Sequence, residues 1–277
     1  MKNPKVLYIL ISVFCVFAII AGIYAQFIDG DYTPTNSSQH GDDSSEKDQV
    51  QIGKEFEQLF TNTLIFENFD STGIQKLNSD NDIVYTIYEK KEENENYEID
   101  LHIPIVNIKS DLATKLNQFT QNNFVNKAND IMKNTDSTKK SKYSIDYIAY
   151  INGDILSVVI KTAFKEGDSA QRIIIKTYNY NLATHEEPTL NELITLKKLN
   201  KNEVNNKIKE VVSQAHNEDL ALQNMGITQI YMRDLSDPMY SVEGANTYFL
   251  GQDSKLYIIY AYGNSEFTSK MDIILFE

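Results

Sequence analysis

The stretch KYSIDYIAYINGDILSVVIKTAFK, residues 142–165, decides the fold class of this chain. Polar and apolar residues alternate on both sides of Asn152-Gly153, as they do in strands with one buried face. Asn and Gly both tolerate the positive φ angles of a type I′ turn. The stretch therefore predicts a β-hairpin that turns at Asn152 and Gly153.

Strand and helix patterns alternate along the rest of the chain. Period-two runs predict strands at 82–90, 97–106, 172–181, 246–250, 256–262 and 270–276. Helical stripes predict helices from about Gln51, from Ser110 or Asp111 to about Asn134 with Phe119 on the apolar face, and at about 201–216. A short turn is predicted to begin at Thr189, where Thr189 and Glu192 fit a capping box. We expect an α+β fold of antiparallel sheets with packed helices, in two similar strand–helix–strand halves at about 51–166 and 167–277.

Residues 6–28 form an apolar run of 23 residues without a charged side chain. As a helix this run would be roughly 35 Å long, which exceeds the roughly 30 Å hydrocarbon core of a bilayer. Lys2 and Lys5 precede it and acidic residues follow, so residues 1–5 are expected to be a cytoplasmic stub and the rest extracytoplasmic. We expect a single-pass protein of the cell membrane with a transmembrane signal anchor. A cleaved signal peptide is the alternative, because Ile23-Tyr24-Ala25 fits a cleavage site.

Residues 29–50 are rich in Asp, Ser, Gly and Asn and are expected to be a disordered linker. Beyond residue 28 the chain has 24 basic and 39 acidic residues, a net charge of −15. This charge repels phosphate backbones, so no nucleic-acid partner is expected, and it attracts basic partners. The solubility of an exposed domain is the simpler explanation of the same charge.

Motifs that carry chemistry are scarce. The single cysteine, Cys15, excludes an intramolecular disulfide and a thiolate zinc site, and no glycine-rich phosphate loop, HExxH or GxSxG motif occurs. Position six of one calcium-loop match is Ile83 instead of glycine, and the chain reads as a strand from there. The four residues of that match are Asn78, Asp80, Asp82 and Glu89. We predict no catalytic, cofactor-binding or metal-binding residues, and no enzymatic activity.

The histidines lack the spacing of metal ligands. His102 is expected to be an edge-strand side chain and His185 a loop residue. His216 is expected to be a cation at a helix end, where the helix dipole favours positive charge.

Two segments resemble a known family. YNYNLATHEEPTLNELI (178–194) resembles the N-[FY]-[DN]-L-x-T-x-x-x-x-L-x-[DE]-L run of an extracytoplasmic domain of unknown function, found at the C-terminus of the anti-sigma factor RsiV and in the peptidoglycan deacetylase PdaC. TYFLGQDSKLYIIYAYGNSEFTSKMDIILF (247–276) is similar to the closing strands of that family. Many members carry a Gly-Gly-Ala-His loop where this chain has residues 165–170, so a ligand role of that histidine is not implied here. The resemblance implies the sensor-like or wall-facing module alone, without the sigma-binding or deacetylase parts.

These features predict a non-catalytic, membrane-anchored extracytoplasmic binding or sensor domain. RsiV-like domains bind lysozyme, so the resemblance implies a lysozyme-like basic protein or a cell-wall component as partner. The predicted contact residues are Asp253, Glu266, Tyr257 and Tyr262, with the acidic 92–98 loop as further surface; the tyrosines are also expected to lie mostly in the sheet interior. The alternatives are an enzyme or enzyme accessory acting on cell-wall peptidoglycan, and a structural assembly subunit.

Overall fold

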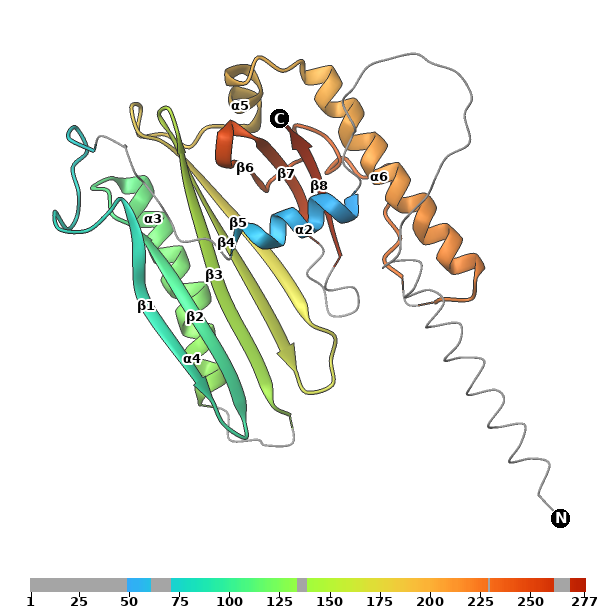
Figure 1. Ribbon diagram of the computed structural model, residues 1–277, viewed down its shortest axis with the longest axis horizontal. Helices are drawn as coiled ribbons and strands as arrows, with labels where there is room; N and C mark the ends of the chain where they lie inside the picture. Colours follow the sequence, from blue (N-terminus) through green and yellow to red (C-terminus); the bar gives the residue numbers. More distant parts are fainter. Residues whose placement is uncertain (1–48, 61–70, 134–138, 229, 262–269) are drawn as a thin grey trace, which may run out of the picture. The chain divides into compact units, whose positions relative to one another are not determined.

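The computed structural model of the chain describes residues 49–60, 71–133, 139–228, 230–261 and 270–277 (Figure 1). All of them belong to one compact unit, Lys47–Glu277. No helix within these ranges is long and apolar enough to cross a bilayer. The anchor predicted at 6–28 lies outside the described residues, as does nearly all of the predicted linker, so both stay predictions.

Two β-sheets and the helices that pack on them make up the described part of this unit, which confirms the α+β class. The larger sheet has the order β1-β2-β3-β4-β5 and the smaller sheet the order β6-β7-β8. The strands of the two sheets are β1 (Val84–Glu93), β2 (Tyr97–Val106), β3 (Ser141–Asn152), β4 (Ile155–Glu166), β5 (Arg172–Asn181), β6 (Tyr248–Leu250), β7 (Leu256–Ala261) and β8 (Met271–Phe276). The helices are α2 (Gln49–Leu59), α3 (Asp111–Thr120), the π-helical turn η1 (Gln121–Val125), α4 (Asn126–Met132), α5 (Leu190–Leu196), α6 (Lys201–Asn224) and the 3-10 turn η2 (Gln252–Ser254).

The larger sheet is mixed, which corrects the expectation of purely antiparallel sheets. β2 and β3 pair in parallel, while every other adjacent pair in the two sheets is antiparallel. The reason is the connection: α3, η1 and α4 carry the chain back along the sheet between β2 and β3, as parallel pairing requires. The two halves also differ, because β5 pairs with β4 and so completes the first sheet.

The β3–β4 hairpin is confirmed, but its predicted turn is wrong by one residue. Asn152 pairs with Ile155, so the turn residues are Gly153 and Asp154. Gly153 has φ of 58° while Asp154 keeps a negative φ, which is the pattern of a type II′ turn. The Asn152 side chain contacts the segment that follows β6. Its Nδ2 donates to the carbonyls of Leu250 and Gly251 at 3.3 and 3.1 Å.

The predicted first residues of the helices agree with the structure better than the predicted last residues. The Ser110 hydroxyl accepts from the Ala113 N–H at 3.1 Å and caps α3, and Thr189 and Glu192 form the predicted capping box of α5. α6 runs to Asn224, eight residues beyond the predicted end at His216. His216 is therefore an internal helical residue, and its Nδ1 lies 2.9 Å from the Arg233 carbonyl oxygen.

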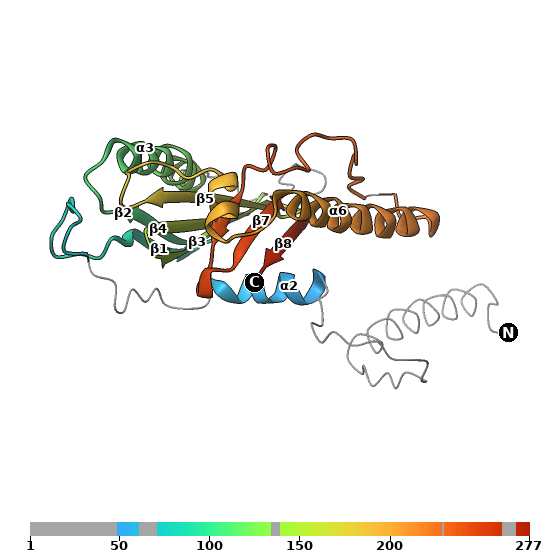
Figure 2. The ribbon, with the colours of Figure 1, turned by 90° about the horizontal axis from the view of Figure 1, so that it is seen from above.

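Apolar side chains fill both faces of the larger sheet. α3 and α4 cover one face over Ile99, Leu101, Ile145 and Ile160. α2 packs on the opposite face with Phe56 against Ile148 and Val159, together with one face of the smaller sheet. Figure 2 shows α3 and α2 on opposite sides of this sheet.

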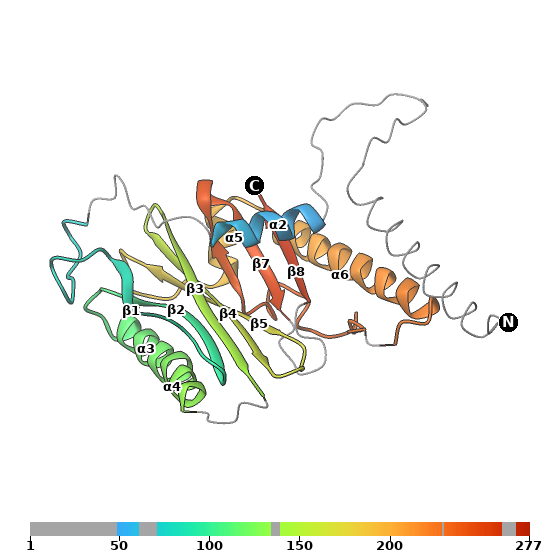
Figure 3. The same ribbon diagram turned by 60° about the horizontal axis from the view of Figure 1, so that its bottom comes forward.

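The smaller sheet is buried on both faces too. Its second face packs on α5 and α6, where Ile258 and Ile274 meet Leu193, Val204 and Ile208. Figure 3 shows α6 running beside β8. Since adjacent residues of a strand point to opposite faces, β7 has to be apolar at every position, and Leu256 to Tyr260 are all buried.

A row of hydrogen bonds joins the two sheets. The Ser157 hydroxyl donates to Asn179 Oδ1 at 2.7 Å and accepts from the Leu250 N–H at 3.1 Å. Asn179 Nδ2 donates to the Tyr248 carbonyl at 2.8 Å, and the Tyr248 N–H donates to Thr177 Oγ1 at 3.1 Å. Side chains of β4 and β5 thus satisfy the outer edge of β6, which would otherwise leave backbone groups unpaired.

Candidate binding pocket between α3 and β5

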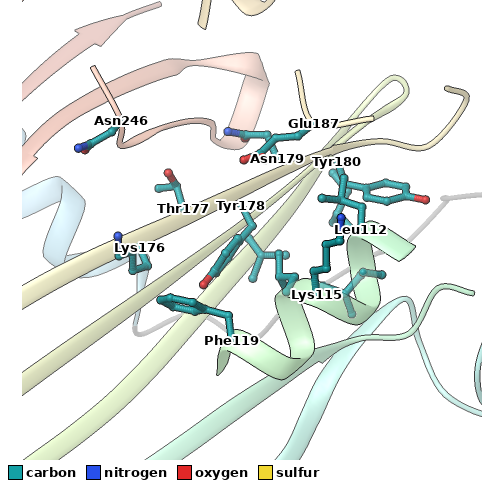
Figure 4. Close-up of a pocket in the computed structure, with 15 residues that line it drawn as sticks. Leu112, Lys115, Phe119, Lys176, Thr177, Tyr178, Asn179, Tyr180, Glu187 and Asn246 are labelled. Atoms are coloured by element: carbon teal, nitrogen blue, oxygen red, sulfur yellow. The ribbon is translucent and has the colours of Figure 1, made fainter. Parts of the chain in front are cut away.

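A pocket of about 380 Å³ lies between α3 and β5 (Figure 4). Its apolar floor comes from Val106, Leu112, Leu116, Leu156 and Val158. The polar residues that line it come from α3, β5 and two loops: Lys115, Lys176, Thr177, Asn179, Glu187 and Asn246. An apolar cavity with a few convergent polar groups is the usual form of a ligand site.

Aromatic rings form one wall of the pocket. Phe119 on α3 and Tyr178 on β5 meet edge to face, with their centroids 6.1 Å apart. Phe119 is 38 % exposed although it lies on the predicted apolar face of its helix. Figure 4 shows its ring beside Tyr178 and Lys176. A ring held in this way offers an apolar face to a ligand without a large cost in side-chain entropy.

The Tyr178 hydroxyl adds an unpaired polar group to this wall. It is buried and has no hydrogen-bond partner among the described residues. The nearby Thr120 hydroxyl donates to the Leu116 carbonyl at 3.0 Å, and its interaction with Tyr178 partly offsets the effect of burial on the pKa of that tyrosine. Burial raises the pKa of Tyr178 well above its ordinary value, so the hydroxyl keeps its proton even at alkaline pH where an exposed tyrosine ionises. It can therefore donate to a ligand or accept from it.

The loop after β5 is fixed by short-range polar contacts. Asn181 Oδ1 accepts from the N–H groups of Ala183 and Thr184 at 2.9 and 3.0 Å. Tyr180 Oη and His185 Nδ1 are 2.6 Å apart, and His185 has a positive φ of 63°. These bonds position the loop that leads to Glu187 at the pocket. The family-like run 178–194 therefore contributes turn, cap and sheet-joining residues as well as pocket residues.

Tyr257, one of the predicted contact residues, does not line this pocket. Tyr257 is 6 % exposed and its ring stacks on Phe249 with centroids 4.6 Å apart, so it belongs to the sheet interior, where the tyrosines of this strand are expected to lie. Asp253 lies in η2. Tyr262 and Glu266 fall outside the described residues, so their contact roles stay predictions.

The acidic 92–98 loop is largely neutralised by lysines. Glu92 is bonded by Lys90 and Tyr97, Glu93 by Lys140, and Glu98 by Lys142. The hydrogen bond from Lys90 lowers the pKa of Glu92, and the one from Lys140 lowers the pKa of Glu93. The loop therefore presents ion pairs more than bare negative charge.

The calcium-loop match has a structural explanation. The buried Asn107 side chain donates to the carbonyls of Asn78, Asn81 and Asp82 at 2.8, 3.2 and 2.9 Å, and accepts from the Asn78 N–H. The backbone carbonyl oxygens of this segment thus accept hydrogen bonds from the side-chain amide of Asn107, which holds the segment in its conformation. Within the described ranges, no group of three or more His, Cys, Asp or Glu side chains is arranged to hold a metal.

His102 lies on β2, an interior strand of the sheet, which corrects the edge-strand expectation. Its Nδ1 lies 2.9 Å from Asp146 on the adjacent strand. This partner was not visible in the sequence, because 44 positions separate the two residues and parallel pairing aligns them.

Sequence reasoning missed the pocket itself. Phe119 was assigned to an apolar helix face, and Lys176 and Tyr178 to a strand pattern. The sequence does contain a signal for this surface. Arg172, Ile174, Lys176 and Tyr178 occupy every second position of the strand, so their side chains share one face of β5.

Comparison with known proteins places the chain only loosely. No family model matches it, and no curated protein sequence matches it. Solved structures similar to parts of it include two DUF3298 family proteins. A DUF3298 family protein from Pseudomonas aeruginosa PAO1 is 11 % identical with a TM-score of 0.32, over 62 % of this chain and 75 % of that chain. A DUF3298 family member from Bacteroides fragilis NCTC 9343 is 11 % identical with a TM-score of 0.30, over 64 % of this chain and 80 % of that chain.

Proposed function

We propose that this chain is a membrane-anchored extracytoplasmic binding or sensor domain without catalytic activity, and that its ligand site is the pocket between α3 and β5. The observation that supports this proposal is the pocket itself: an apolar floor, an exposed aromatic ring and an unpaired buried hydroxyl on rigid elements. The anchor at 6–28 and the resemblance to RsiV-like and PdaC-like modules point to partners at the cell surface. A cell-wall component is the first candidate ligand.

A pull-down on insoluble peptidoglycan tests this proposal. The unit Lys47–Glu277, which contains both sheets and all three apolar clusters, should sediment with the wall. Phe119→Ala should weaken the binding by about tenfold, because a central aromatic anchor typically contributes more than 1 kcal/mol. Leu196→Ala is the matched control, since Leu196 is 57 % exposed on α5 and does not line the pocket. Equal sedimentation of both variants would remove the pocket from the proposal.

The net charge supports a second candidate partner, a basic protein such as a lysozyme. A charge of −15 beyond residue 28 would speed the encounter. Such a protein would dock away from Lys115 and Lys176, which repel it at the pocket. Mixing the unit with lysozyme at low and moderate salt tests this candidate, and the absence of a complex at both would exclude it. Sugars or acetate released from the peptidoglycan in the first experiment would instead support the enzyme alternative.

A further inference from the structure

β5 is an edge strand whose outer side is open. It pairs with β4 on one side and, within the described ranges, with no strand on the other. The edge closes only beyond Tyr180, where the Asn181 N–H donates to the Glu186 carbonyl at 2.9 Å. The outer backbone groups of Arg172 to Tyr180 are thus available to a further strand. An open edge of this kind is a template for strand addition.

One face of this edge carries cations that aromatic rings hold in place. Lys176 Nζ lies 6.0 Å from the centroid of Phe119. Lys127 Nζ and the Arg172 guanidinium lie 4.5 and 4.9 Å from the centroid of the same ring, Phe164. Ile174, between the two cations of β5, is 41 % exposed. The edge therefore alternates charge and apolar surface along its length.

These cations have no acidic partner in the described part of the chain. None of Lys127, Arg172 and Lys176 takes part in an ion pair there, whereas the lysines near the β1–β2 hairpin are paired with glutamate or aspartate. Two cations against one ring, unneutralised in an acidic protein, form a surface complementary to anions.

We propose that β5 binds an extended acidic segment of a partner protein, which adds to the larger sheet as a strand. Its carboxylates contact Lys127, Arg172 and Lys176, and an apolar side chain enters the pocket beside Phe119 and Tyr178. The inference rests on the proposed function, because it uses the same pocket, but it assigns a protein segment and not a cell-wall component as the ligand. A peptide is favoured because only a peptide backbone matches the alternating donors and acceptors of a strand edge.

The spacing of the cations sets the pattern of the segment. Arg172 and Lys176 are four residues apart, which is about 13 Å along a strand. Acidic residues four positions apart in the partner, with the intervening side chain on the same face being apolar, match this spacing. The negative charge elsewhere on the protein slows the encounter with an acidic segment, but it is attenuated over about 8 Å at physiological ionic strength, so the contacts at the cations decide the affinity.

The test measures the affinity of the full-length chain in detergent for synthetic peptides as long as β5, which has 10 residues. A peptide with glutamate at every fourth position and valine elsewhere should bind. The Arg172→Glu/Lys176→Glu double variant should weaken this binding by about tenfold or more. Lys209→Glu/Lys207→Glu makes the same charge change on α6, away from β5, and should leave the affinity within about twofold. A peptide with lysine in place of glutamate should not bind.

Two further measurements distinguish strand addition from binding through charge alone and from binding of another ligand. N-methylation of alternate peptide bonds removes backbone donors but keeps every charge, and should abolish binding. Equal affinity for the methylated peptide, or for inorganic polyphosphate, would overturn strand addition in favour of a simple anion site. Failure of the acidic peptide to bind while Phe119→Ala still reduces wall binding would overturn this inference and leave the proposed function standing.

Discussion

Arg233 holds Asp272 through two parallel hydrogen bonds, from Nε to Oδ2 at 2.8 Å and from Nη2 to Oδ1 at 2.6 Å. Both side chains are buried, as is Asp219, which accepts from the third guanidinium nitrogen and from Lys270 Nζ. The cluster ties α6 to β8 through the segment between α6 and β6. A planar guanidinium suits this role because its donors match two carboxylates at once.

Arg233→Met should lower the free energy of unfolding by about 3–5 kcal/mol, because it leaves two buried carboxylates without their main partner. Urea denaturation checks this value. Lys201→Met is the matched control, since it breaks the exposed Lys201–Glu243 pair, and it should cost less than about 1 kcal/mol. Equal losses in the two variants would show that burial of the Arg233 cluster has no energetic consequence.

Asn179→Ala should destabilise the junction between the sheets by about 1–3 kcal/mol, because the Tyr248 carbonyl and the Ser157 hydroxyl lose a buried partner. Amide hydrogen exchange should also become faster in β6 than in β1. Asn123→Ala provides the control, since that amide is exposed and bonds only the Phe119 carbonyl, and its effect should stay within about 0.5 kcal/mol. Unchanged exchange in β6 would show that the junction does not depend on Asn179.

The sequence predicted individual strands well because each has its own alternating pattern. β2, β3, β4, β5, β7 and β8 all lie within three residues of their expected ranges. Local chemistry also located the caps at Ser110 and Thr189, because a cap is decided by residues three positions apart.

Pairing between distant segments was not readable from the sequence. The partner of β2 is β3, and nothing local to Leu101 distinguishes a parallel neighbour at Ile145 from an antiparallel one. Asn152 shows the same effect within a single turn. Its contacts with Leu250 and Gly251, 98 and 99 positions away, are tertiary bonds that accompany the shift of the turn by one residue. The pocket escaped prediction because it combines α3 with β5.

Gly153→Ala and Gly53→Ala should change stability in opposite directions. A Cβ at either position would have no atom within 4 Å, so packing does not contribute. Gly153 has φ of 58°, and an alanine held there should cost about 1–2 kcal/mol. Gly53 lies inside α2, where alanine should stabilise the helix by about 0.5–1 kcal/mol. Thermal denaturation measures both, and a stabilised Gly153→Ala would contradict the assigned turn.

Buried tyrosines should make the protein unstable in alkali. Burial raises the pKa of Tyr150 from 10.0 to about 12, with a smaller contribution from Tyr257, and burial also raises the pKa values of Tyr143, Tyr178 and Tyr260. The unfolded chain loses these protons near pH 10 while the folded chain keeps them. The stabilisation is therefore complete below pH 10 and is lost as pH rises toward the folded pKa.

Circular dichroism during urea unfolding at several pH values checks this dependence, with tyrosinate absorbance reporting the ionisation of the rings. The midpoint should fall as pH rises from about 10 to about 12, and the buried rings should ionise only as the chain unfolds. Tyr150→Phe removes one of the titrating groups while keeping the stack on Phe249, so its midpoint should fall less steeply over the same interval. An identical slope in the variant and the natural chain would show that Tyr150 ionises freely in the folded state.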